Sequence, residues 1–150
     1  MAVLRDRPYG QFNFLVSIEG IDPKSVQGGF MEVSGLGTEI EVIEYRAGNS
    51  PLNAPIKLTG LYRVPDVSLK RGLIGSLDLY EWLREVRNGS QNALRAVVIQ
   101  LLSEDRSTVV QEWRLVNARP VVYRGPALDA LVEDVAIEEL VLASEDIELA

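Results

Sequence analysis

Two residue types that dominate enzyme chemistry are missing from this 150-residue sequence, which has no cysteine and no histidine. Without cysteine, thiol catalysis, iron–sulfur clusters and cysteine-rich zinc sites are excluded. Without histidine, the chain lacks the usual proton shuttle near neutral pH and the commonest transition-metal ligand. Any acid–base chemistry would therefore depend on carboxylates.

Basic residues are scarce in the second half of the chain. Residues 1–75 hold 8 Lys/Arg and 8 Asp/Glu, whereas residues 76–150 hold 7 and 14. From Asp129 onward there are eight acidic residues and no basic one. Tight binding to a phosphate backbone needs clustered Lys and Arg side chains. We therefore expect no stable nucleic-acid binding, and an acidic, solvated surface.

Long apolar runs are absent as well. No stretch approaches the roughly 18 residues of a membrane span, so no transmembrane segment is predicted. The first ten residues, MAVLRDRPYG, lack the apolar centre of a secretory signal. We therefore expect synthesis and folding in the bacterial cytoplasm. With 47% apolar and 25% charged residues and no evident linker or repeat, residues 1–150 are predicted to form a single domain.

The pattern that is present is mostly one of strands. The first predicted strand is QFNFLVSIE, with one face made of Phe12, Phe14, Val16 and Ile18. Further strands are predicted in FMEVSG, TEIEVIEYR, PDVSLKRG, ALRAVVIQLL, TVVQEWRLV and NARPVVYRG. Pro120 should place the last of these at a bend or an edge. Asp22-Pro23 predicts a turn.

One helix is predicted over residues 77–88, because Leu79, Leu83 and Val86 fall on one face and Trp82 widens that stripe. Residues 127–150 are ambiguous. They have helical spacing and helix-favouring Ala, Glu and Leu, but also a strand-like alternation that Glu139 interrupts. Periodicity leaves both interpretations open.

The carboxylates do not form a catalytic pattern. Glu39 with Glu41, or Glu138 with Glu139, could make an acid–base pair, but repetitive charge of this kind is typical of a solvated face. The glycines match neither the P-loop nor the dinucleotide fingerprint. We predict no catalytic residue, no cofactor and no metal site, and we look instead to the surfaces of the molecule.

One strand carries an unusual pattern. In TEIEVIEYR the apolar positions are first Ile40 and Val42 and then Ile43 and Tyr45, so the apolar phase shifts by one residue. A bulge within the monomer would produce this pattern. A strand that passes into a second packing environment, such as a neighbouring copy, would also produce it.

Several stretches, in order and spaced almost end to end, carry a family resemblance. They are PYGQFNFLVSIEG, FMEVSGLGTEIEVIEYRAGN, VSLKRG, LDLYEWLREVRNG, VVIQLLSED, WRLVNARPV and DVAIEELVLASEDIEL. Together they resemble the tail tube protein family of contractile-tailed bacteriophages and contractile injection systems. Residues 52–66 are less typical of that family and are expected to form a loop peculiar to this assembly.

The resemblance implies a mainly β (α+β) fold of packed antiparallel sheets, a sandwich or barrel with one flanking helix. It implies that DVAIEELVLASEDIEL is a strand, and that sheets continue between the subunits of a hexameric ring. Rings would stack into a hollow inner tube inside a contractile sheath, with baseplate, spike and tail-terminator proteins at its ends. The cargo in the lumen would be DNA or a protein effector, and the particle a phage tail or a related injection apparatus.

Two other functions stay open. One is a baseplate-proximal tube initiator or a secreted ring-shaped effector carrier. The other is a small β-rich hydrolase that uses two carboxylates, although the resemblance implies a structural protein rather than an enzyme.

Three surfaces are predicted with the help of the resemblance. The subunit interface is expected to include Ile43, Tyr45 and Arg46, while the Glu39/Glu41 half of the strand packs within its own subunit. The lumen, where a wall without cations lets charged cargo slide, is expected to be faced by some of Glu39, Glu41, Glu133, Asp134 and Glu138. The polar face of the helix, available to the sheath, carries Glu81, Arg84, Glu85 and Arg87.

Overall fold

The computed structural model describes residues 2–21 and 29–150, and the predicted turn at Asp22-Pro23 lies outside this part of the chain. The elements are β1 (Phe14–Ile18), β2 (Glu32–Ser34), β3 (Glu39–Tyr45), β4 (Ile56–Arg63), β5 (Val67–Gly72), α1 (Asp78–Arg87), β6 (Arg95–Leu102), β7 (Val109–Arg124), β8 (Ile137–Ala143) and β9 (Asp146–Leu149). The prediction of a mainly β fold with one helix is confirmed.

Most strands belong to one antiparallel sheet with the order β1-β6-β7-β8-β5-β2, and β9 also pairs with β7. Strand β7 links the two halves of this sheet, because its first part pairs with β6 and β9 and its second part with β8. Its register against β8 shifts between Pro120 and Val122. The bend predicted at Pro120 therefore lies inside one long strand, and the prediction of two separate strands was wrong.

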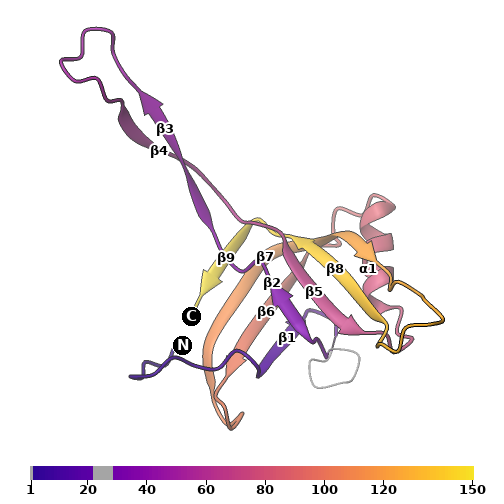
Figure 1. The fold of residues 1–150 in the computed structure, drawn as a ribbon. Coiled ribbons are helices and arrows are strands. Elements are labelled where there is room, and N and C mark those ends of the chain that lie inside the picture. The colour runs from indigo at the N-terminus through magenta and orange to yellow at the C-terminus, as the bar shows by residue number, and fades with distance from the viewer. Residues whose placement is uncertain (1, 22–28) are drawn as a thin grey trace.

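The bent sheet closes around an apolar core, and we call this part of the molecule the body (Figure 1). Alternation explains which side chains enter it. In β1, Val16 and Ile18 are buried as predicted, whereas Phe12 precedes the strand and is exposed. In β5, Val67 and Leu69 face the core, and in β8 Leu140 and Leu142 meet them from the paired strand.

The single helix packs on the body through its predicted stripe. Leu79 and Trp82 are fully buried, while Leu83 and Val86 are half-buried. The indole N–H of Trp82 donates to the carbonyl oxygen of Ala93 at 2.6 Å, which fixes the helix against the chain that leads into β6. Trp82 is thus the centre of the contact rather than its margin.

The C-terminal segment forms strands β8 and β9, as the resemblance implied and against its helical propensity. The burial pattern of β8 alternates strictly, and the buried residues are Glu138, Leu140 and Leu142. The opposite face of β8, with Ile137, Glu139 and Val141, is half-buried.

Strands β3 and β4 form a separate two-stranded sheet that projects from the body (Figure 1). We call this hairpin, residues 39–63, the arm. The region that was expected to be a loop, residues 52–66, in fact contains β4, which pairs with β3 over most of its length.

Candidate assembly surface

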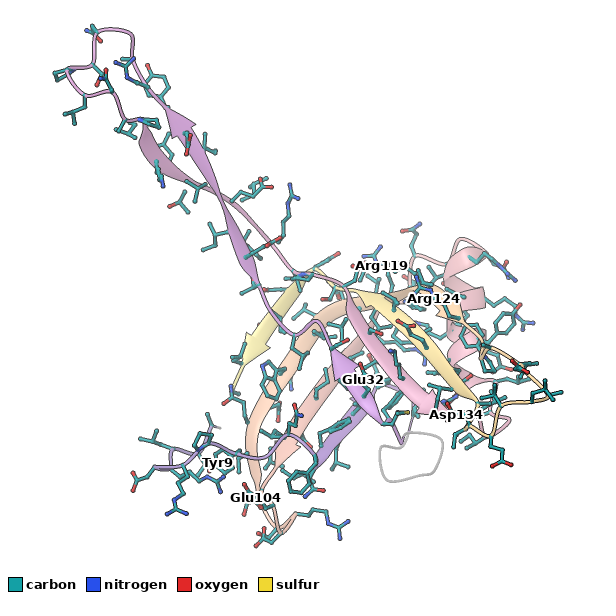
Figure 2. The ribbon with its side chains drawn as sticks, viewed as in Figure 1. Tyr9, Glu32, Glu104, Arg119, Arg124 and Asp134 are labelled. Carbon is teal, nitrogen blue, oxygen red and sulfur yellow. The ribbon has the colours of Figure 1, made fainter. Side chains whose placement is uncertain are left out.

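The arm is exposed along its whole length. Every residue of β3 is exposed, and so is every residue of β4 except Gly60. Figure 2 shows side chains standing out from both sides of the ribbon. The expectation that the Glu39/Glu41 half of β3 packs within its own subunit is therefore wrong, because nothing in the body covers that half.

The pairing of the two strands contains one bulge. Val42 lies opposite Thr59 and Ile40 opposite Tyr62, so Gly60 and Leu61 together face the single residue Glu41. A β-bulge is defined by two residues on one strand opposing one on its partner. The bulge lies in β4, and β3 itself keeps regular alternation.

The bulge sorts the arm into two apolar patches on opposite faces. Side chains alternate along a strand, and directly opposed residues share a face. On one face, in the half nearest the body, is the base patch, made of Ile40, Val42 and Tyr62. On the other face, toward the end of the arm, is the tip patch, made of Ile43, Tyr45, Ile56 and Leu58.

Charged residues lie behind each patch. Glu39, Glu41 and Arg63 share a face opposite the base patch, where Arg63 forms an ion pair with Glu41. Glu44 lies opposite Lys57, on the face away from the tip patch. The apparent change of buried face in TEIEVIEYR thus corresponds to two surfaces that point in opposite directions.

Exposed apolar side chains in this number need a partner. Ile40, Val42 and Tyr45 are 61%, 60% and 57% exposed. An isolated two-stranded hairpin is marginally stable at best in water, and contiguous exposed apolar patches mark interaction sites. The arm is therefore the strongest candidate for an assembly surface among the described residues.

Arg46, predicted at the interface together with Ile43 and Tyr45, has a local role in the structure. Its guanidinium donates from Nε to the carbonyl oxygen of Leu52 at 2.9 Å, and from Nη2 to that of Ser50 at 3.4 Å. These bonds close the loop at the end of the arm. Arg46 therefore shapes the arm next to the tip patch.

A buried charge cluster fixes the body where α1 meets the sheet. Arg71 and Glu138 are 1% and 2% exposed and form an ion pair between β5 and β8. Arg71 also binds Asp78 at 2.6 Å, and the hydroxyl of Tyr123 donates to Glu138 at 2.7 Å. Glu138 is consequently unavailable to a lumen surface, and that part of the prediction was wrong because its carboxylate is the internal partner of Arg71.

The cluster shifts the pKa values of its members. The hydrogen bond to the Glu138 carboxylate, with burial, raises the pKa of Tyr123 to about 12. Burial by itself would raise the pKa of Asp78, but its hydrogen bonds with Arg71 and Ser76 outweigh burial and lower the pKa. The lowered pKa keeps Asp78 ionised near neutral pH and the raised pKa keeps the Tyr123 hydroxyl a neutral donor, which suits a structural tie rather than proton transfer.

The other acidic residues predicted for the lumen are exposed. Glu39 and Glu41 lie on the arm, and Glu133 and Asp134 lie in the irregular segment between β7 and β8. Asp134 is labelled in Figure 2 at the far end of the body from the arm. The structure therefore does not bring these four residues together within one chain.

The predicted polar face of the helix is present. All four of its residues are exposed. Glu85 lies 3.9 Å from Arg95, and Arg87 donates to the hydroxyl of Tyr80 at 3.4 Å. Glu81 and Arg84 are exposed beside them, and the face is open to a partner.

The described residues contain no cluster of metal-binding side chains. No group of three or more His, Cys, Asp or Glu side chains in this part of the chain could hold a metal ion. None of its helices is long and apolar enough to cross a membrane.

Sequence reasoning missed the β4 half of the surface. Ile56, Leu58 and Tyr62 lie within residues 52–66, which were expected to form a loop because this stretch is less typical of the family than its flanks. Their spacing did carry a signal: Ile56 and Leu58 alternate with Lys57 and Thr59, as a half-buried strand does.

Comparison with known proteins gives a consistent picture. The family model described as T4-like virus tail tube protein gp19 matches residues 10–148. No match was found among curated protein sequences.

Solved structures agree with the family match. A chain in the baseplate of the anti-feeding prophage (AFP) is 27% identical with a TM-score of 0.82, and the match covers 97% of each chain. A chain in the sheath–tube complex of the extracellular contractile injection system PVC is 25% identical with a TM-score of 0.79, and the match covers 95% of this chain and 91% of that one. Hcp1 from Flavobacterium johnsoniae shares the fold at 15% identity, with a TM-score of 0.55 over 91% of this chain and 94% of that one. Because the family model spans nearly the whole chain, the protein belongs to the family of T4-like virus tail tube proteins.

Proposed function

We propose that this chain is the subunit of the inner tube of a contractile injection system or contractile phage tail. Copies form hexameric rings, and the rings stack into a hollow tube that carries DNA or a protein effector. A surrounding sheath contracts and drives the tube through a target envelope, with baseplate, spike and terminator proteins at its ends. The role is structural, and the chain catalyses no reaction.

The observation that carries this proposal is the arm. This two-stranded hairpin, with apolar side chains on both faces, is exposed among the described residues, although the body beside it is well packed. Tube proteins act by associating with copies of themselves, and each copy must offer surfaces that are incomplete alone. The free strand edges of β1 and β2 at the ends of the sheet add further sites for pairing.

Two other surfaces follow from the exposed residues. We assign Glu39, Glu41, Glu133 and Asp134 to the wall of the lumen, where carboxylates would repel phosphate rather than hold it. We assign the helix face with Glu81, Arg84, Glu85 and Arg87 to the sheath. Both surfaces are open in the monomer, which is what each assignment requires.

The proposal is tested by electron microscopy of the purified chain and of the double variant Ile43→Asp/Tyr45→Asp. The unmodified chain is expected to form rings or tubes. The variant places two charges in the tip patch and is expected to stay a folded monomer, with unchanged circular dichroism. Glu44→Gln, on the polar side of the same half of the arm, is the matched control and should assemble. Rings formed by the double variant would overturn the role of the arm.

A tube initiator at the baseplate is the second candidate. It is favoured by the similarity, at 27% identity, to a chain in the AFP baseplate. Long filaments of the purified chain would favour the main tube subunit. Isolated rings that do not stack would favour the initiator or a ring-shaped carrier.

A further inference from the structure

Resting on the proposed function, we propose that each arm joins two different neighbouring copies, one through the base patch and the other through the tip patch. The arm would then form a bridge that contacts two subunits rather than one.

The first argument is direction. A two-stranded ribbon is a single layer, so the base patch with Ile40 and the tip patch with Tyr45 lie on opposite faces of it. These two residues are also five positions apart on β3, about 17 Å at roughly 3.4 Å per residue. One rigid globular copy that covers one side of the arm leaves the other side uncovered.

The second argument is charge. Behind the base patch lie Glu39, Glu41 and Arg63, and the last two are already paired with each other. Behind the tip patch lie Glu44 and Lys57. Each half of the arm therefore has one face suited to burial and one suited to water. A strand buried in the core of a single neighbour would be apolar on both faces along its length.

The third argument is the bulge, since it makes the side chains of β4 follow the sorting set by β3. Gly60 fits this place because a Cβ atom there would lie 3.0 Å from the carbonyl oxygen of Glu41 and 3.3 Å from the Ile43 side chain. The extra residue puts Tyr62, rather than Leu61, opposite Ile40. With an unbroken register Tyr62 would lie opposite Glu39, on the charged face. Bulges that re-aim side chains in this way are features of a site rather than defects.

The body supplies a receptor of matching chemistry, which argues that the occupants are copies of this chain. An apolar hollow opens beside the end strands β1 and β2, and its lining includes Phe14, Val33, Leu36, Ile99 and Trp113. The chain thus carries both an exposed apolar arm and an uncovered apolar hollow. Heterologous contacts between such complementary surfaces close into rings or extend into helical stacks.

The experiment uses the absence of native cysteine, because an introduced cysteine is then the only thiol in the chain. Val42→Cys in the base patch and Leu58→Cys in the tip patch are each labelled with a benzophenone maleimide. A third subunit carries both labels. Each labelled chain is mixed into a large excess of unmodified chain, allowed to assemble, irradiated and separated on a denaturing gel.

Each singly labelled subunit is expected to give crosslinked dimers. The doubly labelled subunit is expected to give trimers as well, at a frequency close to the product of the two single yields. Dimers without trimers would overturn the inference, because they would show that a single copy takes both patches. Glu81→Cys on the exposed face of α1, labelled in the same way, lies outside the arm and is the control for specificity, and it should give no dimers.

This outcome differs from a failure of the proposed function. If the chain does not assemble with copies of itself, the unmodified protein forms no rings or tubes, and no labelled position gives dimers. Assembled tubes that yield dimers but no trimers would refute only the bridge between two subunits.

Discussion

The body and the arm are both built from strands, yet they differ in the burial of their side chains. In the body even two charged residues, Arg71 and Glu138, are fully enclosed and paired with each other. In the arm even Ile43 and Leu58, which lie opposite one another, are about half exposed. The difference shows that one part of this chain is a fold in its own right and the other is an element of an assembly.

The comparison also indicates which side chains would stabilise the assembly by becoming buried. Burying one Val, Leu, Ile, Phe or Met side chain fully is worth about 1.5–3 kcal/mol. The base and tip patches hold seven large apolar side chains whose burial is unrealised in the monomer. The body gains its stability before assembly, and the arm gains most of its stability through assembly.

Removal of the arm should have the largest effect, because it tests whether the body folds alone and whether assembly needs the arm. In a variant with residues 39–63 replaced by a short Gly-Ser turn, the body should keep its circular dichroism spectrum and a cooperative melt, because no core residue lies in the arm. Assembly should be lost completely, as measured by size-exclusion chromatography and microscopy. If the body unfolds without its arm, the body does not fold independently and the arm is part of the same folding unit.

The next largest effect is expected in the charge cluster of the body. Arg71→Met leaves Glu138 buried without its cation, and removing one partner of a buried ion pair costs about 3–5 kcal/mol. Denaturant unfolding of the monomeric Ile43→Asp/Tyr45→Asp background measures this loss. The control is Arg71→Met combined with Glu138→Met, which removes both charges and should recover part of the stability. A loss below about 1 kcal/mol for the single variant would contradict the structural role of the pair.

A matched pair of leucine substitutions tests the two regions directly. Leu142→Ala removes a fully buried side chain from the core and should destabilise the monomer by about 2–5 kcal/mol. Leu58→Ala in the tip patch should change monomer stability by less than about 0.5 kcal/mol, since surface substitutions usually do so. Assembly should show the opposite ranking. Leu58→Ala should weaken it more than Leu142→Ala, because only Leu58 lies on a contact surface. Equal effects of the two substitutions on monomer unfolding would argue against the exposure of the arm.

Much of the body could be predicted from the sequence, because local pattern and tertiary burial agree there. Val16 and Ile18 in β1, and Val67 and Leu69 in β5, stand at alternate positions, and the apolar residues of α1 fall on one helical face, so burial followed the pattern. Residues 109–124 were predicted as two strands, because Asn117 and Pro120 look like a break in the strand pattern. The chain instead continues through a bend, in which Asn117 adopts a positive φ of 51°.

The candidate site was harder to predict, because burial by another copy leaves no trace in the periodicity of one strand. Ile43 and Tyr45 could be identified from the apolar phase shift in β3. The bulge that places Tyr62 opposite Ile40 lies in β4, in the segment that was expected to be a loop. Glu138 shows the converse. It continues the buried stripe of Leu140 and Leu142, as Arg71 continues that of Val67 and Leu69, and opposite charges at equivalent ends of two apolar stripes indicate a buried pair.

The smallest expected effect concerns the N-terminal segment, which has little regular structure but is tied to the body. Figure 2 shows Tyr9 and Glu104 near each other at one end of the molecule. Arg5 binds Glu104 at 2.6 Å and stacks 3.8 Å from the centre of the Tyr9 ring. The hydrogen bond from Arg5, with backbone hydrogen bonds, lowers the pKa of Glu104 from 4.5 to about 2. If this contact belongs to the body, it should contribute to monomer stability in a pH-dependent way.

The sign of that contribution follows from the lowered pKa. A carboxylate whose pKa is lower in the folded state stabilises the fold above about pH 4.5, and this contribution is lost as the pH falls toward 2. Thermal melts of the monomeric background should therefore show a small decrease in Tm for Glu104→Gln at pH 7, and no difference near pH 2. Because the pair is exposed, high salt should shrink the difference at pH 7. A difference that stays constant from neutral to acidic pH would mean that the segment is held by packing rather than by this ion pair.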